Sequence, residues 1–191
     1  AFGADAGAAM GIVQKINMVP MQIAMGLSQG IMPLISYNYA SRNIQRMKRT
    51  LLFAVKIALG FLFLVILEPK GAWSGGFLRI LIQLFMSNEA IVAYGTRFLR
   101  GFCLGLPFLG MDFIAVAVFQ ASGLGKNALV FAILRKIVLE IPALFILNAL
   151  FPLYGLPYAQ PVAEVILSIA AVLVLLRLFR KLEADAATPS A

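Results

Sequence analysis

The 191-residue sequence has no histidine, only one cysteine, and few charged residues of either sign. With Cys103 alone it cannot close a disulfide within the chain, and without histidine it lacks the commonest catalytic base. It has no G-x-S-x-G motif and no G-x-x-x-x-G-K-[ST] phosphate-binding loop, which disfavours a hydrolase and an ATP-driven pump. We therefore expect no enzymatic activity, no cofactor and no metal site.

Apolar side chains are what the sequence has in abundance. They make up 62% of the residues against 13% that are charged, and the mean hydropathy of +0.94 is far above that of a soluble domain. The apolar stretches are continuous and about twenty residues long, whereas a transmembrane barrel has alternating segments of about ten. The composition therefore predicts an all-α membrane protein, a polytopic bundle of transmembrane helices.

Five spanning helices and one short interfacial helix are expected. Prolines and charged residues mark the ends of the spans, because proline stops a helix and charge avoids hydrocarbon. Residues 1–183 would form the bundle, and the small polar segment 184–191 a disordered tail. The expected spans run from about Gly11 to Tyr39, Arg46 to Glu68, Thr96 to Ser122, Asn127 to Phe151 and Tyr158 to Phe179, with the interfacial helix at Phe77–Met86.

The net charge of +8 could suggest a nucleic-acid partner, but the basic residues stand at the ends of the apolar spans. We therefore expect no nucleic acid. Loops rich in lysine and arginine remain on the cytoplasmic side of a membrane. This rule predicts a multi-pass protein of the cell membrane, such as a bacterial inner membrane, with the C-terminal tail in the cytoplasm. The loop after the first span is expected on the same side and carries Arg42, Arg46, Lys48 and Arg49.

Acidic residues within the apolar spans are the sharpest functional candidates, because a carboxylate in hydrocarbon is costly and is usually kept for function. Asp112 lies eleven residues before Gly123, which places it about 16 Å from the end of its helix and close to the membrane midplane. A carboxyl group there could exchange a proton or hold Na⁺. The alternative is an Asp that only hydrogen-bonds between helices.

Glu140 is a second candidate for cation coupling or substrate binding. Lys136 lies one turn before it, so a structural ion pair is at least as good an interpretation. Glu164 is expected about two turns from the outer end of its helix, where solvent could reach it, and it is the weakest of the three acids.

The first expected helix has two unlike sides. One side is aliphatic and suits lipid, and the other carries methionine and glutamine, which suits a cavity that adapts to differently shaped amphipathic molecules. Packing against other helices would explain the second side equally well. Two G-x-x-x-G pairs, Gly26 with Gly30 and Gly101 with Gly105, predict close contacts between helices. The proposed cavity-lining residues are Gln14, Met18, Met21, Met25, Gln29 and Met32.

Two segments carry a resemblance to a known family. QGIMPLISYNYASRN, residues 29–43, resembles the signature after the second helix of each half of multidrug and toxic compound extrusion (MATE) transporters. IPALFILNALFPLYGL resembles the penultimate helix and following turn of that family. MATE transporters have twelve helices in two six-helix lobes, and the resemblance implies that this chain matches helices eight to twelve. Some MATE subgroups carry a cation-coupling Asp on the helix that corresponds to that of Asp112.

The resemblance implies secondary active multidrug efflux, in which H⁺ or Na⁺ is exchanged for amphipathic, cationic small molecules. The partners would be the lipid bilayer, these substrates, and the first lobe together with the first helix of the second lobe. Two alternatives stay open: a lipid-linked saccharide flippase of the same superfamily, and a membrane assembly subunit that does not transport. An intramembrane enzyme would require Asp112 and Glu140 to face each other across a wet cleft.

Overall fold

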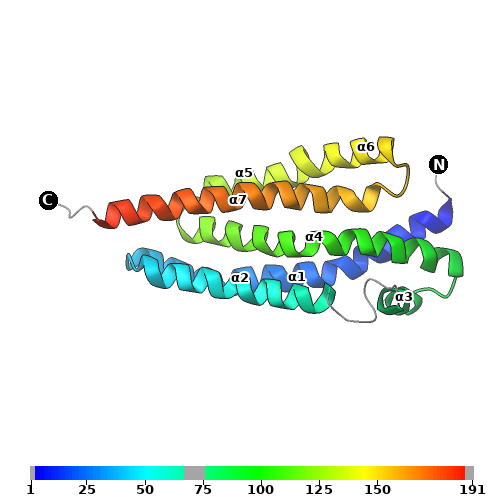
Figure 1. The fold of residues 1–191 in the computed structure, drawn as a ribbon, viewed down its shortest axis with the longest axis horizontal. Coiled ribbons are helices and arrows are strands. Elements are labelled where there is room, and N and C mark those ends of the chain that lie inside the picture. Colours follow the sequence, from blue (N-terminus) through cyan, green and yellow to red (C-terminus); the bar gives the residue numbers. More distant parts are fainter. Residues whose placement is uncertain (1–2, 67–75, 188–191) are drawn as a thin grey trace.

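The computed structural model describes residues 3–66 and 76–187, and every regular element in these ranges is a helix (Figure 1). The long helical segments run along an elongated bundle in alternating directions. α1, α4 and α7 point one way, and α2 and the α5–η1–α6 segment point the other way. The expected all-α bundle is confirmed. The elements are α1 (Ala4–Ala40), α2 (Ile44–Ile66), α3 (Gly76–Gln83), α4 (Glu89–Ala121), α5 (Gly125–Ile133), the π-helix η1 (Leu134–Glu140), α6 (Ile141–Leu150) and α7 (Leu156–Ala187).

Three helices, α1, α4 and α7, are each long and apolar enough to cross a membrane. They correspond to the first, third and fifth expected spans. The second expected span is α2, which has 23 residues and a length of about 35 Å. The expected end of this span at Glu68 lies outside the described residues. The interfacial helix is α3, which is eight residues long.

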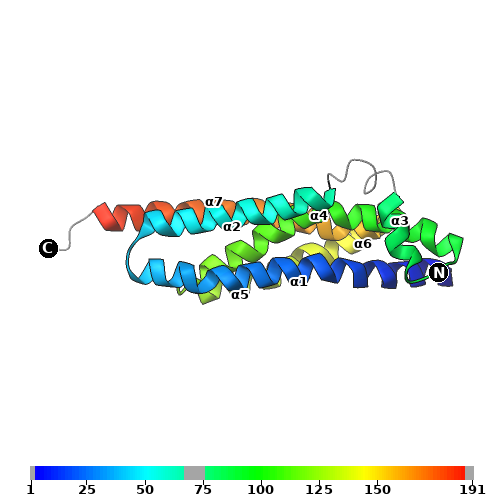
Figure 2. The same cartoon turned by 90° about the horizontal axis from the view of Figure 1, so that it is seen from below.

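The centre of the bundle is α4, which packs against α1, α2, α3, α5 and α7. Figure 2 shows the same bundle from below, with α1 running along most of its length. In the most apolar stretch of each helix, 56% of the residues of α4 are buried, compared with 22% in α1 and 39% in α7. A central helix needs small side chains so that neighbours can approach, and α4 supplies Gly95, Gly101, Gly105 and Gly110, all of which are buried.

One of the two predicted G-x-x-x-G contacts is present within this chain. A Cβ added to Gly101 would lie 2.9 Å from Pro157 Cβ, and one added to Gly105 would lie 3.1 Å from Pro161 Cα. These two glycines therefore let α4 and α7 approach closely. Gly26 and Gly30 differ, because an added Cβ would meet no atom of the described chain within 4 Å.

Two helix ends differ from the expectation, and one agrees with its capping sequence. α1 begins at Ala4, seven residues before Gly11, because the alanine-rich start is a good helix former. α4 begins at Glu89, as the capping sequence Ser87-Asn88-Glu89 predicts, and the Asn88 side chain accepts a hydrogen bond from the Ala90 N–H. α7 continues to Ala187, into the segment 184–191 for which a disordered tail is predicted.

The fourth expected span is divided into three pieces, α5, η1 and α6, which follow one another without a turn. In η1 the bonds run from residue i to i−5, as in the bond from the Ile141 N–H to the Lys136 carbonyl. Pro142 follows at once and has no N–H to donate to the preceding turn. Pro142 therefore coincides with a change of helix type within this span.

Gly101→Ala is expected to destabilise the protein, because the new methyl group would overlap the Pro157 ring, which cannot move aside as a flexible side chain would. The expected cost is about 1–3 kcal/mol, as for other overpacked sites. Thermal unfolding of the full-length gene product in detergent measures it.

Gly26→Ala is the matched control, since it has the same chemistry in an α-helix with open space around the new methyl group. It should leave the melting temperature unchanged or raise it, because alanine favours helix over glycine. Equal melting temperatures for the two variants would contradict the close α4–α7 contact.

Candidate functional site

Asp112 lies on the face of α4 that points into the bundle. Its exposure is 1%, and in residues 3–66 and 76–187 no N–H group or hydroxyl donates a hydrogen bond to its carboxylate oxygens. The polar group beside it is the Glu164 carboxyl, to which it can hydrogen-bond only when one of the two acids carries a proton. An ionised carboxylate without a partner is unstable in an apolar interior, and such exceptions are common at functional sites. Asp112, the strongest candidate from the sequence, therefore lies in a buried environment where no donor of the described residues hydrogen-bonds its ionised form.

Glu164 lies beside Asp112, although it was expected to be wetted. It is 1% exposed, its side chain interacts with the Asp112 carboxyl, and its Oε2 also lacks a hydrogen-bond partner within the described part of the chain. The expectation of a solvent-exposed Glu164 is therefore wrong. It fails because Pro161, one turn earlier, packs on Gly105 and carries this part of α7 against α4.

Arg135 is the third member of the cluster, and sequence reasoning assigned it no role. Its Nε lies 3.8 Å from Glu164 Oε1, which is ion-pair contact without a hydrogen bond. Its guanidinium also lies over the Phe113 ring, with Cζ 4.7 Å from the ring centroid. The side chain of Arg135 is 17% exposed. A cation in the middle of an apolar span was the available signal, because such a residue needs an anionic partner.

Glu140 pairs with Lys136, as the spacing of four residues indicates. Lys136 Nζ lies 2.7 Å from Glu140 Oε2 and 2.9 Å from Oε1. This pair is more accessible than the Asp112 cluster, since the side chain of Lys136 is 59% exposed. The acid beside Asp112 is thus Glu164, and Glu140 has a local cation of its own.

A neutral polar contact lies one helical turn from Glu164. The Asn17 amide on α1 donates a hydrogen bond of 3.3 Å to Gln160 Oε1 on α7. Asn17 is buried on the packing face of α1, and Gln160 precedes Glu164 by one turn. Polar side chains of α1, α4, α7 and η1 therefore lie inside a bundle whose buried residues are mainly apolar.

The methionine and glutamine side of α1 packs on α4 only in part, through Met21, which contacts the cluster of Leu106 and Leu109. Val13, Ala24 and Ile31 are among the buried residues of α1, whereas Met18 is 50% exposed. Gln14 and Gln29 are exposed, and Met21, Met25 and Met32 are half-buried. Within this chain the side is therefore partly covered, and its proposed role as a cavity lining stays a prediction.

The basic residues of the loop after α1 lie at the same end of the bundle as the C-terminal part of α7. Lys48 of α2 forms an ion pair with Glu183 of α7. The loop itself bends at Arg42, whose φ of 54° is in the left-handed region and allows the Asn43 N–H to bond the Asn38 carbonyl at 2.9 Å. Arg46 and Arg49 follow on the first turns of α2.

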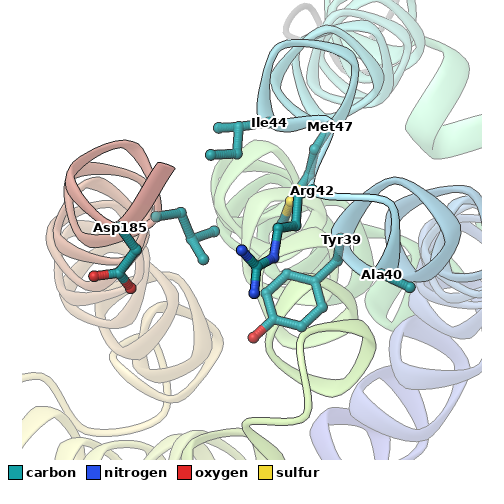
Figure 3. Close-up of a pocket in the computed structure, with 7 residues that line it drawn as sticks. Tyr39, Ala40, Arg42, Ile44, Met47 and Asp185 are labelled. Carbon is teal, nitrogen blue, oxygen red and sulfur yellow. The ribbon is translucent and has the colours of Figure 1, made fainter. Parts of the chain in front are cut away.

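A cavity of about 510 Å³ opens at this end, between the α1–α2 turn and α7. Figure 3 shows Arg42 and Tyr39 extending into it together, with Asp185 on α7 across from them. The residues that line this cavity are far along their helices from those of the Asp112 cluster. The lining combines charged and apolar groups. Its lining consists of Tyr39, Ala40, Arg42, Ile44, Met47, Leu182 and Asp185.

In the described ranges there is no group of three or more His, Cys, Asp or Glu side chains that could hold a metal ion. The Asp112 cluster offers two carboxyl groups and one guanidinium. Two adjacent buried carboxyls can share a proton or bind a monovalent cation between them, and their protonation is coupled. The chemistry available to this site is therefore the exchange of a small positive charge.

Asp112→Asn is expected to raise the melting temperature of the full-length gene product in detergent at neutral pH. The substitution removes one of two adjacent buried acids, and the new amide can donate a hydrogen bond to the Glu164 carboxylate, a gain of about 1 kcal/mol. Asp5→Asn, at an exposed position of α1, should leave the melting temperature unchanged. Marked destabilisation by Asp112→Asn would instead identify Asp112 as a structural hydrogen-bonding residue.

Comparison with known proteins supplies the remaining observations. The family model MatE matches residues 1–146. The multidrug export protein MepA of Staphylococcus aureus strain RF122 is 35% identical over 184 residues, which cover 96% of this chain and 39% of that protein. MepA of Staphylococcus haemolyticus is 34% identical over 188 residues, covering 98% of this chain and 40% of its own length. The chain thus spans about two fifths of the curated relatives it matches.

Solved structures agree on the fold. The Vibrio cholerae MATE transporter VcmN in its bent form superposes with a TM-score of 0.84 at 22% identity, covering 96% of this chain and 41% of the transporter. An outward-facing MATE family transporter of the MOP superfamily gives a TM-score of 0.86 at 20% identity, with coverage of 96% and 41%. At these identities the likeness concerns the fold alone.

Proposed function

The chain belongs to the MatE family, and on that premise we propose that it forms five helices of the second lobe of a multidrug efflux transporter. The lobe would exchange a coupling cation, H⁺ or Na⁺, for amphipathic cationic molecules. The observation that carries this proposal is the pair of adjacent buried carboxyl groups of Asp112 and Glu164, three oxygens of which receive no hydrogen bond from an N–H group or a hydroxyl of the described chain.

The position of the pair suits alternating access. Asp112 lies nine residues before the end of α4 at Ala121, about 14 Å along the helix axis, which is about half the thickness of the hydrocarbon core. Substrate and ion sites of secondary transporters lie near the bilayer midplane. Protonation or cation binding neutralises the pair and makes its burial favourable. Release of the cation leaves a charge that favours a conformation in which water reaches the site. The state of the carboxyls can therefore bias the equilibrium between two conformations of the lobe.

The methionine and glutamine side of α1 is proposed as a contribution to the substrate cavity. Gln14, Met18 and Gln29 are exposed within this chain, and methionine adapts its shape to different apolar surfaces. Gln14 and Gln29 add hydrogen-bonding groups to the same side. The remaining walls would come from the other lobe and from the first helix of the second lobe, which are the proposed partners.

The basic end of the bundle is proposed to face the cytoplasm of the cell membrane. Arg42, Arg46 and Arg49 lie there, and Lys48 joins this end to the C-terminal part of α7 through Glu183. Positive loops remain on the cytoplasmic side during insertion. In this orientation the Asp112 site lies between a cytoplasmic end rich in cations and an external end that contains α3.

In cells that express the full-length gene product, Asp112→Asn is expected to abolish the dependence of ethidium efflux on an imposed H⁺ or Na⁺ gradient. The amide can neither gain nor lose a proton at neutral pH and binds cations weakly. We expect gradient-driven efflux to fall by about tenfold or more, equivalent to about 1.4 kcal/mol of lost coupling. Dye fluorescence after a rapid change of external pH or Na⁺ measures it.

Asp5→Asn serves as the control, because it makes the same chemical change at an exposed position. Its efflux should match that of the unchanged protein. If Asp112→Asn left both efflux and its gradient dependence intact, the buried acids would serve only to hold helices together, and the non-transporting assembly subunit would become the better interpretation.

A further inference from the structure

We propose that Arg135 is a tethered cation that balances one of the two carboxylates of the Asp112–Glu164 pair, so that the site exchanges a single positive charge with the solvent. The ligand is one proton or one monovalent metal ion, and neither a divalent ion nor two protons. This inference rests on the proposed function and adds to it the charge stoichiometry of the site and the residue that sets it.

The contacts of Arg135 suit a cation that stays near the acids without saturating them. Its Nε is 3.8 Å from Glu164 Oε1, beyond hydrogen-bond distance. Its guanidinium lies over Phe113, with Cζ 4.7 Å from the ring centroid, and Phe113 is the residue next to Asp112. The aromatic ring therefore holds the cation beside both acids, while the carboxylate oxygens remain available to another ligand.

Charge balance then fixes the charge of that ligand. The arginine side chain does not lose its proton in proteins, so two ionised carboxylates and one guanidinium leave a net charge of −1. With both acids ionised, three buried carboxylate oxygens, both of Asp112 and Oε2 of Glu164, have no hydrogen-bond donor within the described residues, and the two acids can hydrogen-bond each other only when one of them carries a proton. An unbalanced buried charge is strongly unfavourable. Binding of one proton or one monovalent cation brings the cluster to neutrality and supplies the missing partner.

Neighbouring groups on the surrounding elements do not disturb this balance. Lys136, the next residue along η1, forms an ion pair with Glu140, and its Nζ lies 2.7 Å from Glu140 Oε2. The side chains that α1 and α7 bring together nearby, Asn17 and Gln160, are neutral and bond each other. Lys56 on α2 is exposed. The cluster of Asp112, Glu164 and Arg135 can therefore be treated as one charge unit.

Arg135 also lies on an element that is suited to move. It is the second residue of η1, the π-helical segment that separates α5 from α6 and is followed by Pro142. π-Helical turns within α-helices are rare and frequently occur at functional sites, where the wider turn permits local shifts. A small shift of η1 would change the distance between the guanidinium and Glu164 while the acids remain on α4 and α7.

The test measures coupling stoichiometry in proteoliposomes that contain the full-length gene product. The membrane potential is clamped at zero, and the steady-state accumulation of ethidium is plotted against the imposed pH or Na⁺ gradient on logarithmic scales. The slope gives the number of ions exchanged for each dye molecule. The proposal concerns whichever ion drives accumulation in the unchanged protein.

Three variants have distinct expected slopes. Arg135→Gln leaves both carboxylates to be neutralised from solution, so the slope should increase by one ion. Glu164→Gln leaves Asp112 balanced by Arg135, so the slope should decrease by one ion. The double variant Arg135→Gln with Glu164→Gln again carries a net charge of −1, and its slope should return to that of the unchanged protein.

Two further variants separate this proposal from a general effect of charge. Lys136→Gln removes a cation from the next position, where the lysine pairs with Glu140, and should leave the slope unchanged. Arg135→Lys keeps the charge and should keep the slope, even if transport is slower. An increased slope with Lys136→Gln equal to that with Arg135→Gln would overturn the proposal.

The possible failures can be told apart. If neither gradient drives ethidium accumulation by the unchanged protein, the proposed function itself fails. If a gradient drives accumulation but Arg135→Gln has the unchanged slope, only the role of Arg135 is lost. Should Arg135→Gln fail to fold, Glu164→Gln and the double variant still decide: the single variant must lower the slope, and equal slopes for Glu164→Gln and the unchanged protein contradict the proposal.

Discussion

Two glycines of α4 lie against two prolines of α7, and the helix separation that results decides which side chains fit between them. Gly101 meets Pro157 and Gly105 meets Pro161. In a membrane the lipid is as apolar as the helix surfaces, so close packing replaces the hydrophobic effect as the force that joins helices. Without this contact there would be room for lipid or water between α4 and α7, and the acids beyond it would not be buried together.

The buried acids have a cost that the rest of the bundle offsets. Asp112 and Glu164 lie side by side with a guanidinium that makes only a loose ion pair at 3.8 Å. Packing alone would favour apolar residues of similar volume at these positions. A polar cluster that stays incompletely satisfied is instead suited to a ligand that comes and goes. The extensive contacts of α4 with α1 and α7 supply the stability that allows such a cluster to persist.

The surface of α1 has three sides with different surroundings. Its small and aliphatic buried face packs on α4, and a second aliphatic side that includes Leu27 meets α2. The methionine and glutamine side is partly uncovered, although Met21 packs on α4. The sequence pattern distinguished the last two sides, because they differ in residue type. It did not reveal the packing face, because Asn17 and Ser28 lie on it among aliphatic residues and blur the contrast in polarity.

The sequence by itself determined that the surroundings are a membrane, that the fold is helical, where the main spans lie and which end of the bundle is basic. It could do so because hydropathy, proline and charge act locally along the chain. It also determined the Lys136–Glu140 pair, whose partners are one turn apart on one helix, and it singled out Asp112 from its position in an apolar span. Only the tertiary structure decided that Glu164 and Arg135 join Asp112. These three residues come from three separate elements, and which faces of α4, α7 and η1 meet depends on helix packing and on the π-helical turn, neither of which leaves a periodic signal in the sequence.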